Sequence, residues 1–345
     1  GARDLREVDL ARTDWNAYER SWDFQSLPLL TASTEPTPTL ESSYTAWITQ
    51  NRDTIAEMKR LEEENNRLFI DAYGLADELT PDVPIEQITL TVNPAYRYGG
   101  KLTEEEQWTR FRQDTMEELV SYAIGCMMGR YSLDAPGLIY AHSGNEGFDP
   151  SQYTTFPADD DGILPLLDDE WFADDVTVRV EEFLKVVWGP ESLTENLRFL
   201  EEGLGNPLRK YLLNDFWKSH LQTYKKRPIY WLVQSPKKGF QALIYLHRYS
   251  KDTFNLVLND YLRPYLSKLR GRRETVQQQV DAGGRGTGAL QKELSMIENR
   301  LRELENWERE VLLPLAQQRI EINLDDGVKM NYPKFSGALA MVPGL

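Results

Sequence analysis

Two neighbouring runs of basic and aromatic residues are the part of this chain whose side chains could do chemistry. Residues 225–232 read KKRPIYWL, and residues 237–249 read KKGFQALIYLHRY. Lysine and arginine neutralise the phosphate charges of nucleic acids, and aromatic rings provide flat faces on which bases stack. These residue types therefore indicate the binding of a nucleic-acid backbone, with aromatic rings close to sugars and bases.

The same two runs also fit a purely structural role. Ile229, Trp231, Leu243, Tyr245 and His247 alternate with other residues, which is the pattern of a half-buried β-hairpin. On the residues alone, plain core strands are the favoured interpretation of this pattern.

The charge of the chain is distributed unevenly. The formal net charge of −16 argues against a protein that coats nucleic acid with its whole surface. Residues 205–275 nevertheless hold 15 Lys or Arg and 4 Asp or Glu, a net of +11, whereas the other residues hold 24 and 51, a net of −27. Such a distribution allows one face to meet phosphate while the rest repels it, although uneven charge also simply keeps a large domain soluble.

The composition excludes several classes of site. The single cysteine, Cys126, rules out a disulfide framework, favours a cytoplasmic chain and fits a buried core thiol better than a nucleophile. With only three histidines beside it, the usual zinc sites cannot be built. No apolar run reaches the roughly 18 residues of a membrane span, so we expect no membrane partner. The charged start, which has no methionine, suggests a processed product or, as the favoured alternative, an expressed fragment of something longer.

Three short motifs look like metal or phosphate sites but lack a necessary part. Residues 159–162, DDDG, resemble part of a calcium loop without its bidentate glutamate, so we expect an acidic turn. Residues 283–288, GGRGTG, follow no strand and lack the Gly-Lys-Ser/Thr end of a phosphate loop, so we expect a flexible tip. Asp325 and Asp326 lack the Glu-x-Lys partner of a nuclease site, and we expect a turn there as well.

Hydrophobic spacing predicts a mainly α protein with small β elements, an α+β fold. Its helical C-terminal region is expected to hold an antiparallel helical hairpin and short β-hairpins. We expect six segments: a lead-in and linker at 1–40, a mainly helical subdomain at 41–150, acidic loops and helices at 151–205, a basic aromatic-rich segment at 206–251, a helical hairpin at 252–313, and a tail with short strands at 314–345.

Several elements are predicted in more detail. The lead-in is expected to be extended, and a long helix capped by Ser42 or Ser43 should run to Tyr73, where Gly74 closes it. Residues 85–92 read as a short strand and residues 104–130 as a helix. Pro264 should kink the first arm of the hairpin. Apolar residues at 290, 294, 297, 301 and 304 fit packing inside the hairpin or a coiled coil between two chains.

Several separate blocks of the sequence resemble one protein family. The two basic runs match a pattern of RPIYWL, a short Lys/Gly turn and GFxALIYxHRY, and further blocks occur at residues 88–99, 119–134 and 320–335. In this order they are similar to the C-terminal part of the PglX adenine-specific DNA methyltransferases of bacteriophage exclusion (BREX) defence systems. The resemblance runs from about Trp22 to Phe335 and is weakest at 150–182.

This resemblance implies the transfer of methyl from S-adenosylmethionine to adenine N6, which marks host DNA in a restriction-modification-like defence against phage. Residues 93–96 read NPAY and invite confusion with the NPPY motif of such enzymes, which holds a flipped base. We reject that interpretation, because the third residue is alanine and no glycine-rich cofactor loop precedes it. We expect S-adenosylmethionine in the full-length protein, no cofactor or metal in this chain, and no activity of the chain alone.

Two hypotheses follow. The first is a noncatalytic, DNA-engaging and scaffolding region in the cytoplasm, whose partners are double-stranded DNA and the methyltransferase domain of the same protein. The residues expected to contact DNA are Lys225, Lys226, Arg227, Tyr230, Trp231, Lys237, Lys238, Arg248 and Lys251. The alternative is a protein-interaction module that docks other components of the defence complex or a phage inhibitor. An independent enzyme finds no support in the residues.

Overall fold

The computed structural model describes residues 2–283 and 286–344 as a mainly helical protein with one small sheet, so the expected fold class is confirmed. The chain forms two compact units. Unit 1 comprises residues 1–123, 135–138 and 181–208, and unit 2 comprises residues 124–134, 139–180 and 209–345. The predicted flexible tip at 283–288 includes residues 284 and 285, which lie outside the described residues.

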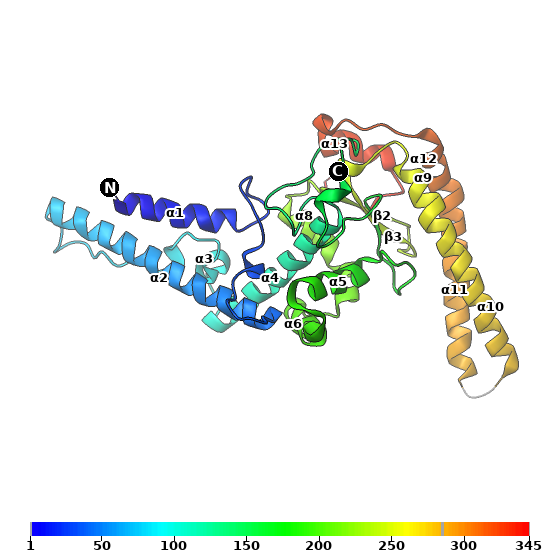
Figure 1. The fold of residues 1–345 in the computed structure, drawn as a ribbon, viewed down its shortest axis with the longest axis horizontal. Helices are drawn as coiled ribbons and strands as arrows, with labels where there is room; N and C mark the ends of the chain where they lie inside the picture. The colour runs from blue at the N-terminus through cyan, green and yellow to red at the C-terminus, as the bar shows by residue number, and fades with distance from the viewer. Residues whose placement is uncertain (1, 284–285, 345) are drawn as a thin grey trace. The chain divides into compact units, whose positions relative to one another are not determined.

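Unit 1 is built from helices. They are α1 (Ala2–Asn16), η1 (Pro28–Leu30), α2 (Leu40–Tyr73), η2 (Ile85–Gln87), α3 (Pro94–Tyr98), most of α4 (Glu104–Met127), the second part of α5 (Val176–Trp188), η4 (Pro190–Ser192) and α6 (Leu193–Leu204). Figure 1 shows α1 lying along α2. Ile55 and Met58 of α2 pack with Phe111 of α4 in a core of this unit.

Local chemistry sets the two ends of α2. The Thr39 hydroxyl accepts from the Ser42 N–H at 3.1 Å, and the Ser42 hydroxyl accepts from the Thr39 N–H at 3.0 Å. This reciprocal cap satisfies two N–H groups that the helix leaves open. Gly74 ends the helix in the left-handed conformation, as expected. The helix begins earlier than predicted, at Leu40, because its N-cap is Thr39 rather than Ser42 or Ser43.

Two expectations for unit 1 are wrong. Residues 2–16 of the lead-in form the helix α1 instead of an extended segment. Residues 85–92 form the turn η2 and irregular backbone instead of a strand. The side chains of Asn93 and Asp14 explain the second difference. The Asn93 amide donates to two carbonyls of this segment, and the Asp14 carboxylate accepts from two of its N–H groups, so the backbone needs no strand partner.

Unit 2 contains the sheet. Its strands are β1 (Ile163–Pro165), β2 (Tyr230–Gln234) and β3 (Gln241–Tyr245), which are antiparallel in the order β1-β3-β2. The predicted hairpin is therefore formed by β2 and β3, with Leu232 opposite Leu243. It is buried on both faces rather than half-buried, because neighbouring side chains of β2 each meet a different aromatic layer. Trp231 contacts Tyr332 and Phe335, whereas Tyr230 stacks on His220.

The helices of unit 2 include the predicted antiparallel hairpin. Its arms are α10 (Arg263–Ala282) and α11 (Thr287–Trp307), which lie side by side in Figure 1. The other helices are η3 (Pro150–Gln152), most of α7 (Leu208–Asn214), α8 (Phe216–Thr223), η5 (Leu246–Arg248), α9 (Thr253–Leu256) and α12 (Leu313–Gln318). Ile297, Leu301 and Leu304 are buried in the core of this unit, so the apolar stripe is used inside the chain rather than between chains.

A π-helical turn adjoins each arm of the hairpin at its base. These turns are η6 (Val257–Leu262), which precedes α10, and η7 (Glu308–Leu312), which follows α11. Pro264 and Pro314 lie directly after them, in the first turn of α10 and of α12. Proline has no N–H and its ring crowds the carbonyl one turn earlier, and a widened turn relieves that crowding. The expected disturbance at Pro264 is thus a π turn.

The tail differs from the prediction of short strands. Residues 324–335 form η8 (Leu324–Asp326), α13 (Gly327–Asn331) and η9 (Tyr332–Phe335), and only Leu339 makes an isolated bridge, to Val233. Asn323 caps η8 by accepting from the Asp325 N–H at 3.1 Å, which favours a helical turn over a strand. In the described residues no helix is long and apolar enough to cross a membrane.

Candidate nucleic-acid interface

Six of the nine predicted contact residues are exposed cations of unit 2. Lys225, Lys226 and Arg227 form the turn between α8 and β2, and Lys237 and Lys238 form the turn between β2 and β3. The sixth, Lys251, follows η5 and lies 3.9 Å from Glu321, with both side chains largely in solvent. Such an exposed pair contributes little to stability and leaves the lysine free to exchange partners.

The first turn has an unusual backbone. Lys225 and Lys226 both adopt the left-handed conformation, with φ of 50° and 62°. The Lys226 N–H donates to the Leu221 carbonyl at 2.7 Å, and the Arg227 N–H donates to the Tyr224 carbonyl at 2.9 Å. These bonds close the end of α8, so the backbone is held while the three side chains extend into solvent.

The second turn is held by α11. The Lys237 N–H donates to the Glu303 carboxylate at 2.9 Å, and the Phe240 N–H donates to the Ser235 hydroxyl at 3.0 Å. Lys238 is left-handed, with φ of 59°, and its N–H donates to the Ser235 carbonyl at 2.9 Å. A carboxylate of the helical hairpin therefore fixes the position of two exposed lysines.

Replacing Gly239 by alanine should loosen this turn. A Cβ atom there would lie 2.2 Å from Glu303 Oε2, so the flexible Glu303 side chain must shift, which weakens its bond to the Lys237 N–H. We expect a loss of about 0.5–1.5 kcal/mol in the free energy of unfolding, measured by urea denaturation. Gly271→Ala is the control, because a Cβ there meets nothing within 4 Å. It should stabilise α10 by about 0.5–1 kcal/mol, and a loss as large as that of Gly239→Ala would contradict this account.

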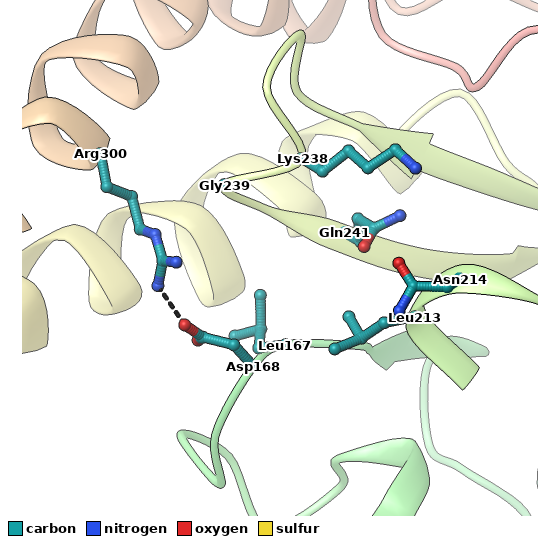
Figure 2. Close-up of a pocket in the computed structure, with 8 residues that line it drawn as sticks. All are labelled: Leu167, Asp168, Leu213, Asn214, Lys238, Gly239, Gln241 and Arg300. Atoms are coloured by element: carbon teal, nitrogen blue, oxygen red, sulfur yellow. Dashed lines mark hydrogen bonds and ion pairs between the residues drawn. The ribbon is translucent and has the colours of Figure 1, made fainter. Parts of the chain in front are cut away.

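Lys238 borders a small surface pocket of about 130 Å³. Figure 2 shows Lys238, Gln241 and Asn214 on one side of it and Arg300 with Asp168 on the other. The Arg300 guanidinium donates to the Asp168 carboxylate at 2.6 Å and to the Tyr265 hydroxyl at 3.1 Å. Because Asp168 neutralises Arg300, Lys238 is the cation that this pocket offers to an anion.

Ion pairs divide the basic residues of unit 2 into two sets. Glutamates of α11 and η7 hold arginines of α10: Arg263 pairs with Glu308, Arg270 with Glu305, and Arg272 with Glu293. Within 2–283 and 286–344, by contrast, no ion pair engages the cations of the two turns, Lys225, Lys226, Arg227, Lys237 and Lys238. The two turns therefore offer five cations without ion pairs to phosphate, whereas much of the excess lysine and arginine on α10 is neutralised.

Three predicted DNA contacts have to be corrected. The exposed fractions of Tyr230 and Trp231 are 0%, and that of Arg248 is 3%. A ring without exposed surface cannot stack on a base, and a buried guanidinium cannot reach a phosphate. Tyr245 and Tyr249, which could pack the hairpin or touch a base, are buried too, and their hydroxyls donate to the Tyr140 and Ile320 carbonyls, both at 2.7 Å. The aromatic residues of the two runs are the core of the sheet.

Arg248 organises the acidic loop of unit 2. Its guanidinium donates to the Asp159 carbonyl at 2.6 Å, to the Asp160 carbonyl at 2.7 Å and to the Asn145 side chain at 2.9 Å. It also lies 3.7 Å from the centroid of the Phe148 ring. All of these partners belong to the loops between residues 139 and 162, so the arginine acts as an internal brace.

His220 has a structural role that the sequence did not suggest. Its Nε2 accepts from the N–H groups of Ile229 and Tyr230, both at 3.2 Å, at the point where β2 begins. Burial, with the Arg130 charge as a second cause, lowers the pKa of His220 to about 3, so the ring stays neutral and can accept. A histidine in the last turn of the helix before the basic run was the only available signal.

The motifs that imitate metal or base-binding sites form ordinary turns. Asp159 Oδ1 accepts from the N–H groups of Asp161, Gly162 and Ile163, so the DDDG segment is a side-chain-stabilised turn. The Asn93 amide of NPAY is fully used within its own segment. Among the residues that the structure describes, no group of three or more His, Cys, Asp or Glu is arranged to hold a metal ion.

Comparison with known proteins places the chain beside long adenine-specific methyltransferases. It is 40% identical over 360 aligned positions to the adenine-specific methyltransferase BrxX of Escherichia coli O9:H4 (strain HS), which covers 99% of this chain and 29% of the relative. It is 37% identical over 351 positions to the adenine-specific methyltransferase PglX of Lacticaseibacillus casei (strain Zhang), in an alignment that covers 95% of this chain and 27% of the relative. No family model matches the chain. The predicted resemblance is confirmed, and the chain spans less than a third of the length of these relatives.

Proposed function

We propose that this chain is a noncatalytic, DNA-engaging and scaffolding part of a longer adenine-N6 DNA methyltransferase of the BREX type, active in the cytoplasm in defence against phage. Similarity over almost the whole chain to BrxX and PglX supports the family. The observation that carries the DNA role is the set of five exposed cations without ion pairs at the two ends of β2. The C-terminal position of this part in the longer polypeptide belongs to the same proposal.

The spacing of the two turns suits a duplex. They flank β2, a strand of five residues, which spans about 17 Å. Phosphates follow each other every ~3.4 Å of axis along one strand of B-DNA, so the two turns would meet phosphates about five base pairs apart. Such contacts set the position of a protein on DNA without reading its sequence.

The chemistry of methyl transfer is assigned to the remainder of the longer polypeptide. S-adenosylmethionine would supply the methyl group there. In this chain the Asn93 amide is already bonded to the carbonyls of Ile85 and Ile88, so it is not available to hold a flipped base. The chain contributes backbone contacts and a rigid platform, and its own cofactor site is not part of the proposal.

The test is a fluorescence-anisotropy titration of the chain with a short duplex at 50 and 200 mM salt. We replace the five turn cations, Lys225, Lys226, Arg227, Lys237 and Lys238, by glutamine. If each contacts a phosphate, the slope of log affinity against log salt should fall by up to about 4.5, with an affinity loss of roughly 100-fold or more at low salt.

The control variant carries the same change of net charge. It replaces five arginines that already have ion pairs, Arg263, Arg270, Arg272, Arg309 and Arg319, by glutamine. It should keep most of the affinity. Equal losses in both variants would mean that only net charge matters, and absence of salt-sensitive binding by the wild-type chain would overturn the proposal.

A further inference from the structure

The inner face of α1 packs on the core of unit 1, as the inner face of a surface helix normally does. Leu10 packs on the core of unit 1, and Asp14 is buried, with its carboxylate accepting from the Thr91 N–H at 2.7 Å and the Val92 N–H at 2.8 Å. These residues are one helical turn apart and face α2 and the segment before α3. The position of α1 on unit 1 is thereby fixed.

The outer face of the same helix carries three exposed apolar side chains beside Arg12, which pairs with Asp9. Leu5, Val8 and Trp15 have exposed fractions of 67%, 52% and 51%. At 100° per residue they lie within an arc of about 80°, on the side of the helix opposite to Leu10 and Asp14. A helix on a protein surface normally turns mostly charged and polar residues outward, so α1 exposes more apolar surface than such a helix usually does.

Further large apolar side chains are exposed on neighbouring segments of unit 1. Trp22, which follows the helix closely, is 98% exposed. The last turns of α2 expose Leu68, Phe69 and Tyr73, and α1 lies along this helix (Figure 1). Large exposed apolar groups gathered on neighbouring elements mark a protein-interaction surface.

The charge of unit 1 indicates what can cover this surface. By sequence, unit 1 holds 14 Lys or Arg and 30 Asp or Glu, a net of −16, whereas unit 2 holds 25 of each. A nucleic acid would be repelled, and a second copy of the same face would bring two strongly negative units together. The complementary occupant is a protein surface with an apolar centre and a basic rim.

We propose that the outer face of α1, formed by Leu5, Val8 and Trp15 and extended by Trp22, docks on such a basic-rimmed surface in the remainder of the longer polypeptide. This inference rests on the proposed function, since the relatives are more than three times as long as the segment that this chain matches. It assigns a position and a chemistry to the contact between this part and the rest of the enzyme.

The experiment compares hydroxyl-radical oxidation of Trp15 and Trp22, read by mass spectrometry, in this chain and in the longer polypeptide. Burial in an interface should slow oxidation of both residues about fivefold or more in the longer polypeptide. The triple variant Leu5→Gln, Val8→Gln and Trp15→Gln should restore rapid oxidation of Trp22. The control, Met296→Gln, changes an exposed apolar residue of unit 2 and should leave the protection intact.

Equal oxidation rates of the two wild-type forms would overturn the docking proposal without any variant. A dimer of the chain in sedimentation velocity that the triple variant dissociates would also overturn it, in favour of a second copy. The outcome is independent of the DNA role, because the triple variant should bind the duplex as the wild-type chain does. Protection of Trp15 and Trp22 from oxidation without salt-sensitive binding of the duplex would contradict only the proposed DNA role.

Discussion

Replacing Arg248 by methionine should destabilise unit 2 more than any other single change considered for the basic runs. The substitution keeps much of the side-chain volume but leaves the carbonyls of Asp159 and Asp160 and the Asn145 side chain without their donor. Buried hydrogen bonds to a charged group contribute about 1.5–3 kcal/mol each, and the losses overlap. We expect the free energy of unfolding to fall by about 3–5 kcal/mol, measured by urea denaturation at neutral pH.

Two further variants, Arg248→Lys and the surface control Lys251→Met, make this test more specific. Arg248→Lys should lie between methionine and wild type, because an ammonium group can reach only part of the three-acceptor set. Lys251→Met removes a cation that is exposed and 3.9 Å from Glu321, and it should change stability by less than about 0.5 kcal/mol. Wild-type stability of Arg248→Met together with a loss of DNA affinity would contradict this structural role of Arg248. It would mean that the guanidinium contacts phosphate.

Asp161 should make the stability of unit 2 fall as the pH rises. The Tyr261 hydroxyl has one hydrogen, yet it lies 3.2 and 3.0 Å from the two Asp161 oxygens, 2.9 Å from an Asp174 oxygen and 3.2 Å from the Ile163 carbonyl. The geometry therefore favours a proton on one of the carboxyl groups. Burial first, and the Asp159 charge second, raise the pKa of Asp161 to about 8.

The direction of the effect follows from proton binding. Between about pH 4 and pH 8 the folded chain holds a proton on Asp161 that the unfolded chain has lost, so stability is highest below this window and is lost as the pH rises through it. Asp161→Asn imitates the protonated group and should flatten the decline, so that the variant is the more stable form at pH 8. Urea denaturation at several pH values measures this.

The neighbouring Asp160→Asn provides the matched control. The Asp160 side chain is exposed, and only its carbonyl is bonded to Arg248. This variant removes the same charge from the same loop and should follow the wild-type pH profile closely. A common profile for wild type and Asp161→Asn would show that the carboxyl group does not titrate in this window.

Helices could be predicted from the sequence where residues within the helix itself determine its buried face and its ends. The spacing of apolar residues in α2, α4 and the hairpin arms reports a buried face, and Gly74 ends α2 through its own left-handed backbone. Residues 85–92 could not be assigned in this way. Their carbonyls and N–H groups are met by Asn93 and by Asp14, and Asp14 lies more than seventy positions away in the chain.

The candidate interface was predictable only in part, for a different reason. Base stacking and core packing select the same aromatic residues, so Trp231 looks alike in both roles until the layer formed by Tyr332 and Phe335 covers it. Likewise, Arg270 looks as available as Lys226 until Glu305 of α11 is brought beside it. The lysines and Arg227 stayed candidates because turns keep their side chains in solvent.

The two π turns make the base of the hairpin tolerant of a change in chain length. Each π turn accommodates a residue more than an α-helical turn of the same rise. Deleting one residue from η6 should therefore leave an ordinary α-helical turn and keep Leu266 and Leu269 of α10 facing the core, although Pro264 would again crowd the preceding turn. The same deletion in η7 should keep α11 and α12 in phase. A one-residue deletion inside α10 or α11 would instead turn the residues that follow it by about 100°.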